Sequence, residues 1–427
     1  MTYRFLFIIL LTFVACKKES DNQKPIIEII SPNENSVYSV LGKIEVSASI
    51  QDDGIIQSVS VSVYDFNAKR NVLKPKYFYP NSNTFQLNDN YIISDSLIYS
   101  GDYYLTITAN DDENQTTAYR LIKIQGIDKK KISALIACTR ATSTDIHEVK
   151  TGNSPQLIAS FDKVCQKLTI NNYHQTMWFL PGAGNKLIGY DLLDQRIDFE
   201  YNHLTASNST IFTDMSLNDE KLYVAAKSGH VKGFNPNFGE GFIYQSPGSS
   251  FVKRIFESQD LLIVSESNLT NQNETVATIY KVSGSPKSSL VYNKELIGFH
   301  EVRPKVAYLI FAKDSTFYFY EYDLDLGFSS QLYSFQGGSF NEVIPINHQE
   351  FILIGNKKVV RFNLATKYIL DLKANLVNAK AAYDDVNQQV YIASGNELTI
   401  VDVQSGATVN TMLFQEEITA IAIRYNR

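Results

Sequence analysis

Residues 390–402, VYIASGNELTIVD, contain the pair of strands that decides the fold. A short apolar run leads through a turn to a second strand, which closes with an apolar and a polar residue, Val401 and Asp402. The apolar run recurs at intervals of 39 to 46 residues, a period typical of the blades of a β-propeller. Its copies begin at Ala134, Met177, Leu222, Leu261, Ala307, Phe351 and Val390.

The second strand of the pair recurs with the same period. Its closing residues are Val149-Lys150, Tyr190-Asp191, Phe234-Asn235, Tyr280-Lys281, Tyr322-Asp323, Phe362-Asn363 and Val401-Asp402. Seven copies of both strands predict a seven-bladed β-propeller over residues 128–427. An unrelated run of antiparallel strands, such as a large sandwich, would have no reason to keep this spacing.

The two ends of the repeat region indicate how the ring closes. The first copy has no innermost strand before Ala134, whereas the terminal segment Ile418–Tyr425 alternates apolar and polar residues and has no blade of its own. We expect this segment to complete the first blade, because an open ring would leave an unpaired strand edge. The stretch Ser394–Val409, SGNELTIVDVQSGATV, resembles the divergent YncE-like propellers, and the strands lack the WD and kelch consensus residues.

Residues 25–127 have a different texture and predict a separate β-sandwich. Apolar and polar residues alternate in Lys43–Ile50, Ser58–Tyr64 and Tyr103–Ala109, between turns rich in Gly, Asn and Asp. Segments such as SIQDDGIIQSVSVSVYD resemble bacterial Ig-like and cadherin-like modules, which mark a fold and not an activity. The basic run that follows, GIDKKK at 126–131, is interpreted as a linker. The predicted fold is therefore all-β.

The N-terminus predicts a lipoprotein. Residues 1–15 combine one positive charge, an apolar run and a final Ala, which is the layout of a signal peptide. The sequence FVAC at 13–16 resembles a lipobox, which implies lipidation of Cys16 and a tether over residues 16–24. The charged tract Lys17–Asp21 resembles the export signals of Bacteroidota surface lipoproteins; a plain solvated tether is the alternative. We expect an outer-membrane, cell-surface location.

The net charge limits the classes of expected partner, and the cysteine content limits the possible disulfides. Removal of residues 1–15 deletes one Arg, which leaves 38 basic residues against 45 acidic ones, a net charge of −7. Nucleic acid is therefore not an expected partner. Cys138 and Cys165 are interpreted either as small buried hydrophobic residues or as a disulfide.

The sequence offers little catalytic chemistry. The six histidines are scattered, with no HExxH motif, and neither a GxSxG motif nor a Walker loop is present. The Gly-rich piece 181–185 is interpreted as a hairpin turn, and a single tryptophan is unlike the quinone-cofactor propellers. We expect no cofactor and no metal. Asn341, Glu342 and Glu301 lie near predicted inner strands and are the candidates for a lactonase-type metal site, with hydrated channel lining as the alternative.

Two features of the first domain can each be interpreted as a binding site or as ordinary structure. The acidic clusters Asp52-Asp53 and 111–113 would suit Ca²⁺, but turn-forming carboxylates explain them better. The aromatic tract Tyr77–Tyr79 would form a sugar-stacking shelf, although an edge strand with one apolar side is the commoner structure.

Specificity is expected on one rim of the propeller, where the loops joining second and third strands meet the connections between blades. A long polar insertion at Ser265–Val276 is either a ligand flap or a tolerated surface excursion. The candidate rim-binding residues are Arg140, Trp178, His230, Glu266, Asn268 and Lys313.

Together these features predict a membrane-anchored, non-catalytic binding protein. Its propeller would contact a small molecule, a glycan or an envelope protein such as a TonB-dependent transporter. In architecture alone it resembles the Bacteroidota surface propellers that capture vitamin B12. The alternatives are a lactonase-like or lyase-like enzyme and a structural component of an envelope complex.

Overall fold

The computed structural model describes residues 23–66, 70–111, 113–184, 186–203, 211–217, 221–235, 238–248, 250–258, 260–268, 273–303 and 305–426. These residues form strands and turns and contain no helix, hence none that could span a membrane. The predicted signal peptide and Cys16 lie outside the described residues. The chain divides into two compact units, of which the first ends at Asp128 and the second begins at Lys129.

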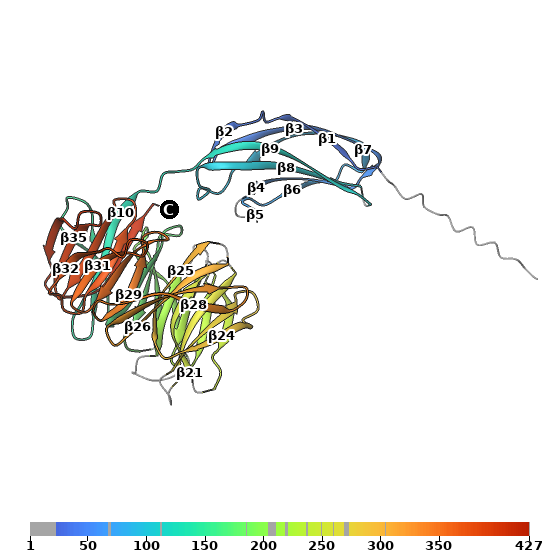
Figure 1. Cartoon of the computed structure of the whole chain (residues 1–427). Helices are drawn as coiled ribbons and strands as arrows, with labels where there is room; N and C mark the ends of the chain where they lie inside the picture. Colours follow the sequence, from blue (N-terminus) through green and yellow to red (C-terminus); the bar gives the residue numbers. More distant parts are fainter. Residues whose placement is uncertain are drawn as a thin grey trace, which may run out of the picture. The chain divides into compact units, whose positions relative to one another are not determined.

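The first unit consists of two β-sheets around one apolar core (Figure 1). Alternate residues of the long strand β3, among them Ile44, Val46 and Ile50, are buried between the sheets. Strand β2 pairs with β9 in parallel, and the other pairs are antiparallel. The smaller sheet contains β1 (Ile26–Ser31), β3 (Lys43–Ile56) and β7 (Ser82–Ile92); the larger contains β2 (Ser36–Ser39), β9 (Gln115–Gln125), β8 (Gly101–Asn110), β4 (Ser58–Asp65), β5 (Arg70–Asn71) and β6 (Lys76–Phe78).

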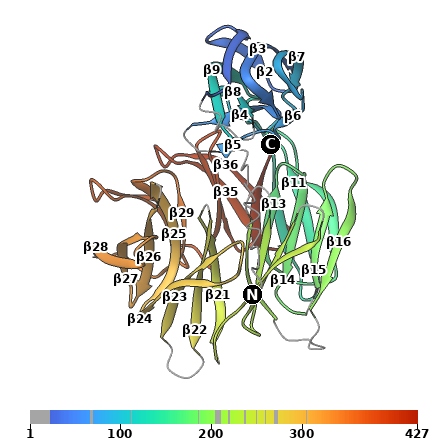
Figure 2. The same ribbon diagram turned by 90° about the vertical axis from the view of Figure 1, so that its right-hand side faces the viewer.

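The described residues of the second unit form seven four-stranded antiparallel sheets, numbered 1 to 7 in chain order. Sheet 1 contains β12 (Gln156–Phe161), β11 (Thr144–Val149), β10 (Lys131–Thr139) and β37 (Glu417–Tyr425); sheet 2 contains β13 (Cys165–Asn171), β14 (Thr176–Pro181), β15 (Lys186–Asp191) and β16 (Arg196–Asn202). Sheet 3 contains β17 (Phe212–Leu217), β18 (Leu222–Ala226), β19 (His230–Phe234) and β20 (Glu240–Gln245); sheet 4 contains β21 (Ser250–Glu257), β22 (Leu261–Asn268), β23 (Glu274–Tyr280) and β24 (Pro286–Tyr292); sheet 5 contains β25 (Glu295–Arg303), β26 (Val306–Lys313), β27 (Thr316–Asp323) and β28 (Phe328–Gln336). Sheet 6 contains β29 (Phe340–Pro345), β30 (Glu350–Gly355), β31 (Lys358–Asn363) and β32 (Ile369–Ala374); sheet 7 contains β33 (Lys380–Asp384), β34 (Gln389–Ser394), β35 (Glu397–Asp402) and β36 (Thr408–Leu413). Figure 2 shows the four strands of sheet 2 side by side.

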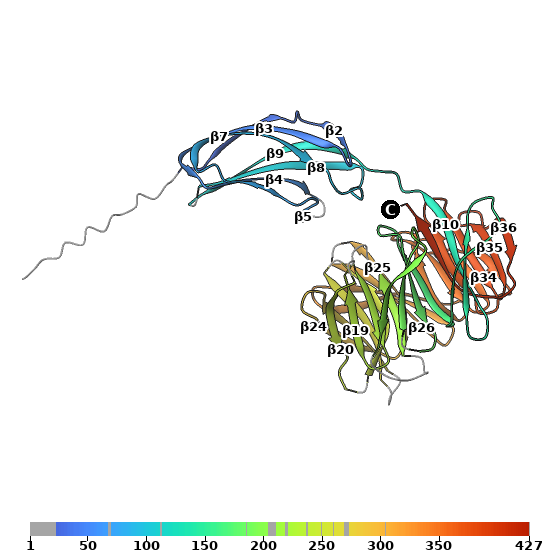
Figure 3. The ribbon, with the colours of Figure 1, turned by 180° about the vertical axis from the view of Figure 1, so that it is seen from behind.

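Buried apolar side chains join the sheets into a ring. Each sheet shares a core cluster with the next one along the chain. A further cluster, which contains Ile136 of sheet 1 and Leu398 of sheet 7, joins the last sheet to the first. Figures 1 and 3 both show β10 beside the strands of sheet 7. This arrangement is a β-propeller.

The C-terminal strand closes the ring, as predicted for Ile418–Tyr425. Strand β37 pairs with β10 from Lys131 opposite Tyr425 to Thr139 opposite Glu417, with two bulges. The buried guanidinium of Arg424 donates to Glu148 at 3.0 Å and to Gln175 at 2.7 Å, in sheets 1 and 2. Burial of this ion pair is tolerated because both charges have hydrogen-bond partners.

The repeated apolar–polar pair has a local physical cause. In sheets 2, 5, 6 and 7 the polar residue accepts hydrogen bonds from the two backbone N–H groups that lie two and three positions later, in the turn to the fourth strand. The four acceptors are Asp191, Asp323, Asn363 and Asp402. Asp and Asn suit this role because their short side chains reach the adjacent backbone. The repeated apolar–polar pair therefore marks the turn that follows the third strand as well as the strand itself.

Cys138 and Cys165 are free and buried, in β10 and β13. Burial, assisted by Asp145 and Glu416, raises the pKa of Cys138 to about 12. Burial likewise raises the pKa of Cys165. Both thiols therefore stay protonated and behave as small apolar residues, and the disulfide considered from the sequence is not formed.

A carboxylate of each acidic cluster of the first unit bonds to nearby backbone: Asp52 within β3, where its pairing with β7 is irregular, and Asp111 in the turn between β8 and β9. Asp52 accepts a hydrogen bond from the N–H of Gly54 at 3.2 Å, and Asp111 accepts one from the N–H of Glu113 at 2.7 Å. Asp112 lies outside the described residues. Among the described residues, no group of three or more His, Cys, Asp or Glu side chains is placed to hold a metal ion.

Deletion of residues 417–427 should abolish cooperative folding of the propeller. Strand β37 contributes Ile418, Ile421, Ile423 and Tyr425 to the cores, and loss of a single large buried side chain costs about 2–5 kcal/mol. We expect a truncated chain to lose the main thermal transition in circular dichroism. Deletion of only residues 426 and 427 is the matched control; equal melting of both truncated chains would contradict the closure.

Candidate functional site

The rim expected to carry specificity is formed by two sets of loops that bond to each other. Turns between second and third strands meet the connections between sheets through backbone hydrogen bonds. Gly182 donates to Val164 at 2.8 Å and Lys227 to Ile211 at 2.7 Å. Leu376 donates to Lys357 and Ile418 to Gly395, at 2.9 and 2.8 Å. The loops of this rim are therefore held on the scaffold.

Three of the candidate residues lie on this rim, in sheets 1, 3 and 5. Arg140 follows β10 and forms ion pairs with Asp145 at 3.0 Å and Glu416 at 3.3 Å, while its side chain stays 55% exposed. His230 begins β19 and lies 3.1 Å from the hydroxyl of Ser228. Lys313 ends β26 and is partly exposed. These side chains are accessible to a partner.

Trp178 was expected in a rim loop but lies within β14 and is 4% exposed. Its indole packs against Phe199 and Phe238, with ring centroids 5.6 and 5.8 Å away. The facing residue on β15 is Gly189, where an added Cβ would lie 3.0 Å from the indole. The glycine leaves room for a large ring, so Trp178 fills a gap in the core between sheets 2 and 3.

The polar insertion at Ser265–Val276 is largely an extended hairpin. Ser265 pairs with Val276 and Ser267 with Glu274 across β22 and β23, so either interpretation of the insertion, ligand flap or surface excursion, is confined to the short connection between these strands. Residues 269–272 of that connection lie outside the described residues. A regular ladder satisfies the backbone groups that a flap would leave to solvent.

Glu266 and Asn268 are placed by this hairpin. Glu266 is 3% exposed and accepts a hydrogen bond from the Tyr244 hydroxyl at 2.6 Å. Asn268 is the last residue of β22, and its N–H donates to the carbonyl of Asn273 at 3.3 Å. Glu266 is therefore a buried structural residue, and of these two candidates only Asn268 lies near the tip of the hairpin.

Inner-strand side chains bond to one another around the centre of the ring. The first strands of successive sheets contact each other, for example β17 and β21. Lys167 pairs with Asp214 at 2.6 Å, and Lys253 pairs with Glu295 at 2.7 Å. The guanidinium of Arg254, in sheet 4, donates to the carbonyl of Asn341, in sheet 6, at 2.7 Å. These contacts cross-link inner strands whose alignment no local sequence pattern indicates.

The residues considered for a lactonase-type metal are not brought together. Asn341 and Glu342 lie at the start of β29, next to the predicted rim, whereas Glu301 lies near the end of β25 at the opposite rim. Glu301 accepts a hydrogen bond from Ser258 at 2.6 Å. The inner strands therefore separate the acids that this chemistry requires to converge.

A pair of histidines that the spacing did not indicate lies between sheets 5 and 6. His300 Nε2 is 3.1 Å from His348 Nδ1. Burial, together with the neighbouring His348, lowers the pKa of His300 to about 4. At neutral pH this imidazole is uncharged.

No protein-family model matches the chain, and no curated protein matches it in sequence. It resembles the solved β-propeller domain of Cps50 (Swd1) from Myceliophteria thermophila, with 10% identity, TM-score 0.49, and coverage of 61% of this chain and 91% of the other. BamB from Moraxella catarrhalis shows 11% identity, TM-score 0.43, and coverage of 69% and 91%. A quinoprotein alcohol dehydrogenase-like protein from Bacteroides thetaiotaomicron shows 10% identity, TM-score 0.47, and coverage of 94% and 99%.

These similarities are distant, and the fold assignment rests on the sheet order and on the cores that join the sheets. The class of protein so defined is an all-β chain with a β-propeller that follows a smaller two-sheet unit. The fold is common to binding proteins, scaffolds and enzymes, so function must be argued from surfaces.

Acidification should destabilise the protein in part through His300. Its pKa in the folded state is about 4, and the unfolded value is about 6.5. The contribution of neutral His300 to stability is therefore complete above pH 6.5 and is lost as the pH falls toward 4. Between pH 7 and pH 5, the melting temperature of the His300→Gln variant should fall less than that of the unchanged chain. Equal losses would show that His300 is not held neutral.

Proposed function

We propose that this chain is a lipid-anchored, non-catalytic binding protein of the outer membrane, exposed at the cell surface, whose propeller contacts an envelope protein such as a TonB-dependent transporter. In this proposal Cys16 carries the lipid, the two-sheet unit is an Ig-like spacer, and the seven sheets are the blades of one closed propeller. The candidate partner-binding residues are Arg140, His230, Asn268 and Lys313.

The rim carries this proposal. Its turns are bonded to the connections between sheets, so little conformational entropy is lost when a partner binds there. Arg140, His230 and Lys313 present polar side chains from three different sheets on the same rim. A rigid surface assembled from several loops suits a protein partner better than a small ligand, which requires an enclosed pocket.

Two alternatives from other classes receive less support. A metal-dependent lactonase would need Glu301 near Asn341 and Glu342, and these residues lie toward opposite ends of the inner strands. A purely structural component of an envelope complex would not need accessible polar side chains on one rim, such as those of Arg140, His230 and Lys313.

Native membranes provide the test. We expect the full chain, solubilised and captured by a C-terminal tag, to retain one stoichiometric membrane protein, and Cys16→Ser to release the chain from the membrane. Arg140→Glu with Lys313→Glu should reduce recovery of the partner about tenfold, equivalent to about 1.4 kcal/mol of binding free energy.

The matched control reverses charge on the opposite rim. Arg196 and Lys305 are exposed cations, each paired with aspartate, so Arg196→Glu with Lys305→Glu makes the same change in net charge. Partner recovery should stay unchanged in this control. Equal loss in both variants, or isolation of the chain without a stoichiometric partner, would contradict the proposal.

A further inference from the structure

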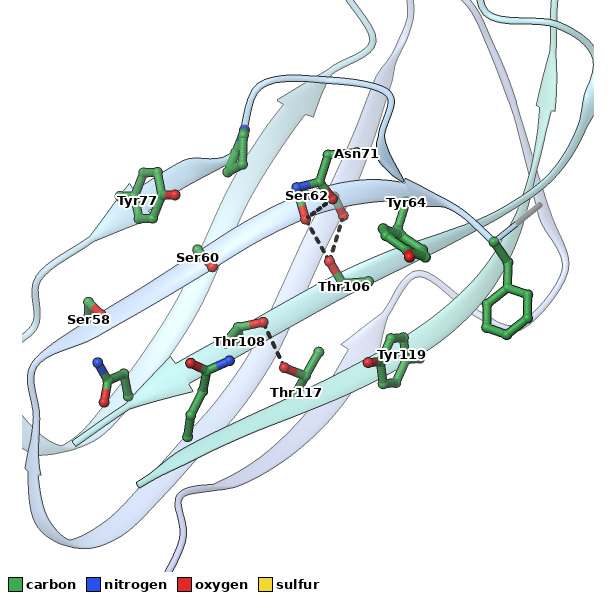
Figure 4. Close-up of a pocket in the computed structure, with 14 residues that line it drawn as sticks. Ser58, Ser60, Ser62, Tyr64, Asn71, Tyr77, Thr106, Thr108, Thr117 and Tyr119 are labelled. Atoms are coloured by element: carbon green, nitrogen blue, oxygen red, sulfur yellow. Dashed lines mark hydrogen bonds between the residues drawn. The ribbon is translucent and has the colours of Figure 1, made fainter. Parts of the chain in front are cut away.

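The larger sheet of the first unit carries a groove of about 570 Å³ on its outer face. Figure 4 shows the floor of this groove, which comes from alternate residues of β4, β8 and β9. Ser60 and Ser62 line the groove, whereas Val59, Val61 and Val63 on the same strand are fully buried in the core. The two-residue period of the strands thus places one polar layer outside a dry interior.

The strand register aligns the floor into rows. One row runs from Tyr77 on β6 through Ser60 on β4 and Thr108 on β8 to Thr117 on β9. At about 4.8 Å between neighbouring strands, four strands make a row about 14 Å long. This length accommodates a segment of an extended polymer.

The groove is lined without charge. Of its fourteen lining residues, six are Ser or Thr, three are Tyr and three are Asn or Gln; the other two are Phe66 and Pro75. Charged residues make up 20% of the whole chain, so a lining of fourteen residues without a single charge departs from the composition of the chain. An uncharged face of this kind excludes phosphate-rich and strongly acidic or basic ligands as its natural occupants.

The hydroxyl groups of the floor are partly oriented and partly free. Ser62 and Thr106 share a hydrogen bond of 2.7 Å, and Thr108 and Thr117 share one of 2.9 Å. The side chains of Ser58 and Ser60 have no hydrogen-bond partner among the described residues. A hydroxyl both donates and accepts, so the floor matches a ligand whose own groups are hydroxyls.

Aromatic rings stand on two sides of this floor. Tyr77 is 57% exposed and Tyr119 is 61% exposed, and Figure 4 shows them on opposite sides of the Ser and Thr rows. Tyr104 packs edge-on against Tyr119, with ring centroids 6.2 Å apart and an interplanar angle of 88°. These exposed rings, of which Tyr119 is held by Tyr104, offer flat apolar faces beside a polar floor.

We propose that this groove binds an uncharged polyhydroxylated chain, namely a segment of a neutral glycan. Sugar hydroxyls would pair with the Ser, Thr, Asn and Gln side chains, and the C–H faces of the sugar rings would lie against Tyr77 and Tyr119. A peptide adding to a sheet would use a strand edge, which this face does not provide. The proposal is independent of any partner of the propeller.

Affinity electrophoresis of the full chain tests the proposal. The gels contain one neutral polysaccharide each, from a panel of β-glucan, xyloglucan, mannan, xylan and starch; polygalacturonate and heparin gels represent acidic polymers. We expect retardation by at least one neutral polysaccharide and by neither acidic one. Tyr77→Ala should weaken binding about tenfold, consistent with loss of one aromatic contact, and Ser60→Lys should abolish it by placing a charge in the floor.

Tyr79→Ala is the matched control, because Tyr79 is 69% exposed on the same segment but does not line the groove. It should bind as the unchanged chain does, and circular dichroism should show all variants folded. The proposal is overturned by absence of retardation in every neutral gel, by binding to acidic polymers alone, or by equal binding of Ser60→Lys and Tyr79→Ala. Specific capture of a protein through Tyr77 in place of any glycan would also overturn it.

Discussion

The pairing of β37 with β10 is the constraint on which the rest of the propeller depends. Without it, β10 would expose an unpaired edge, and the cores on both sides of sheet 1 would lose the buried side chains of β37. The contact between Thr139 and Thr419 joins residues 280 positions apart. Closure therefore depends on a long-range contact, of the kind that makes folding slow.

Much of the propeller could be predicted because its signal is local and repeated. The apolar run recurs because the second strand of each sheet is largely buried on both faces. The polar residue at the end of the third strand recurs because it holds the same kind of turn in four sheets, through Asp191, Asp323, Asn363 and Asp402. The role of the terminal strand could be predicted because the first copy of the repeat lacks an innermost strand and Ile418–Tyr425 has no blade of its own. These are properties of neighbouring residues, which a single sequence displays.

The candidate binding residues were harder to predict because exposure depends on packing between sheets. The prediction of Trp178 as a rim residue is wrong, because Gly189 on the adjacent strand makes room for its indole in the core. Glu266 follows an apolar run and continues it as a buried strand residue. The sequence indicated only one side of the groove, the aromatic tract with Tyr77, because the other lining residues come from strands whose register no local pattern gives. The absence of charge from Ser58 to Tyr64 was the available signal.

The position of β10 also bears on mechanics. This strand is the first of the propeller, and it is hydrogen-bonded to β11 on one edge and to β37 on the other. A tension transmitted along β10 through residues 126–130 would load both ladders in shear, because antiparallel hydrogen bonds lie perpendicular to the strands. The strand through which the chain enters the propeller is thus held along both edges, and the C-terminal strand β37 shares the load with β11.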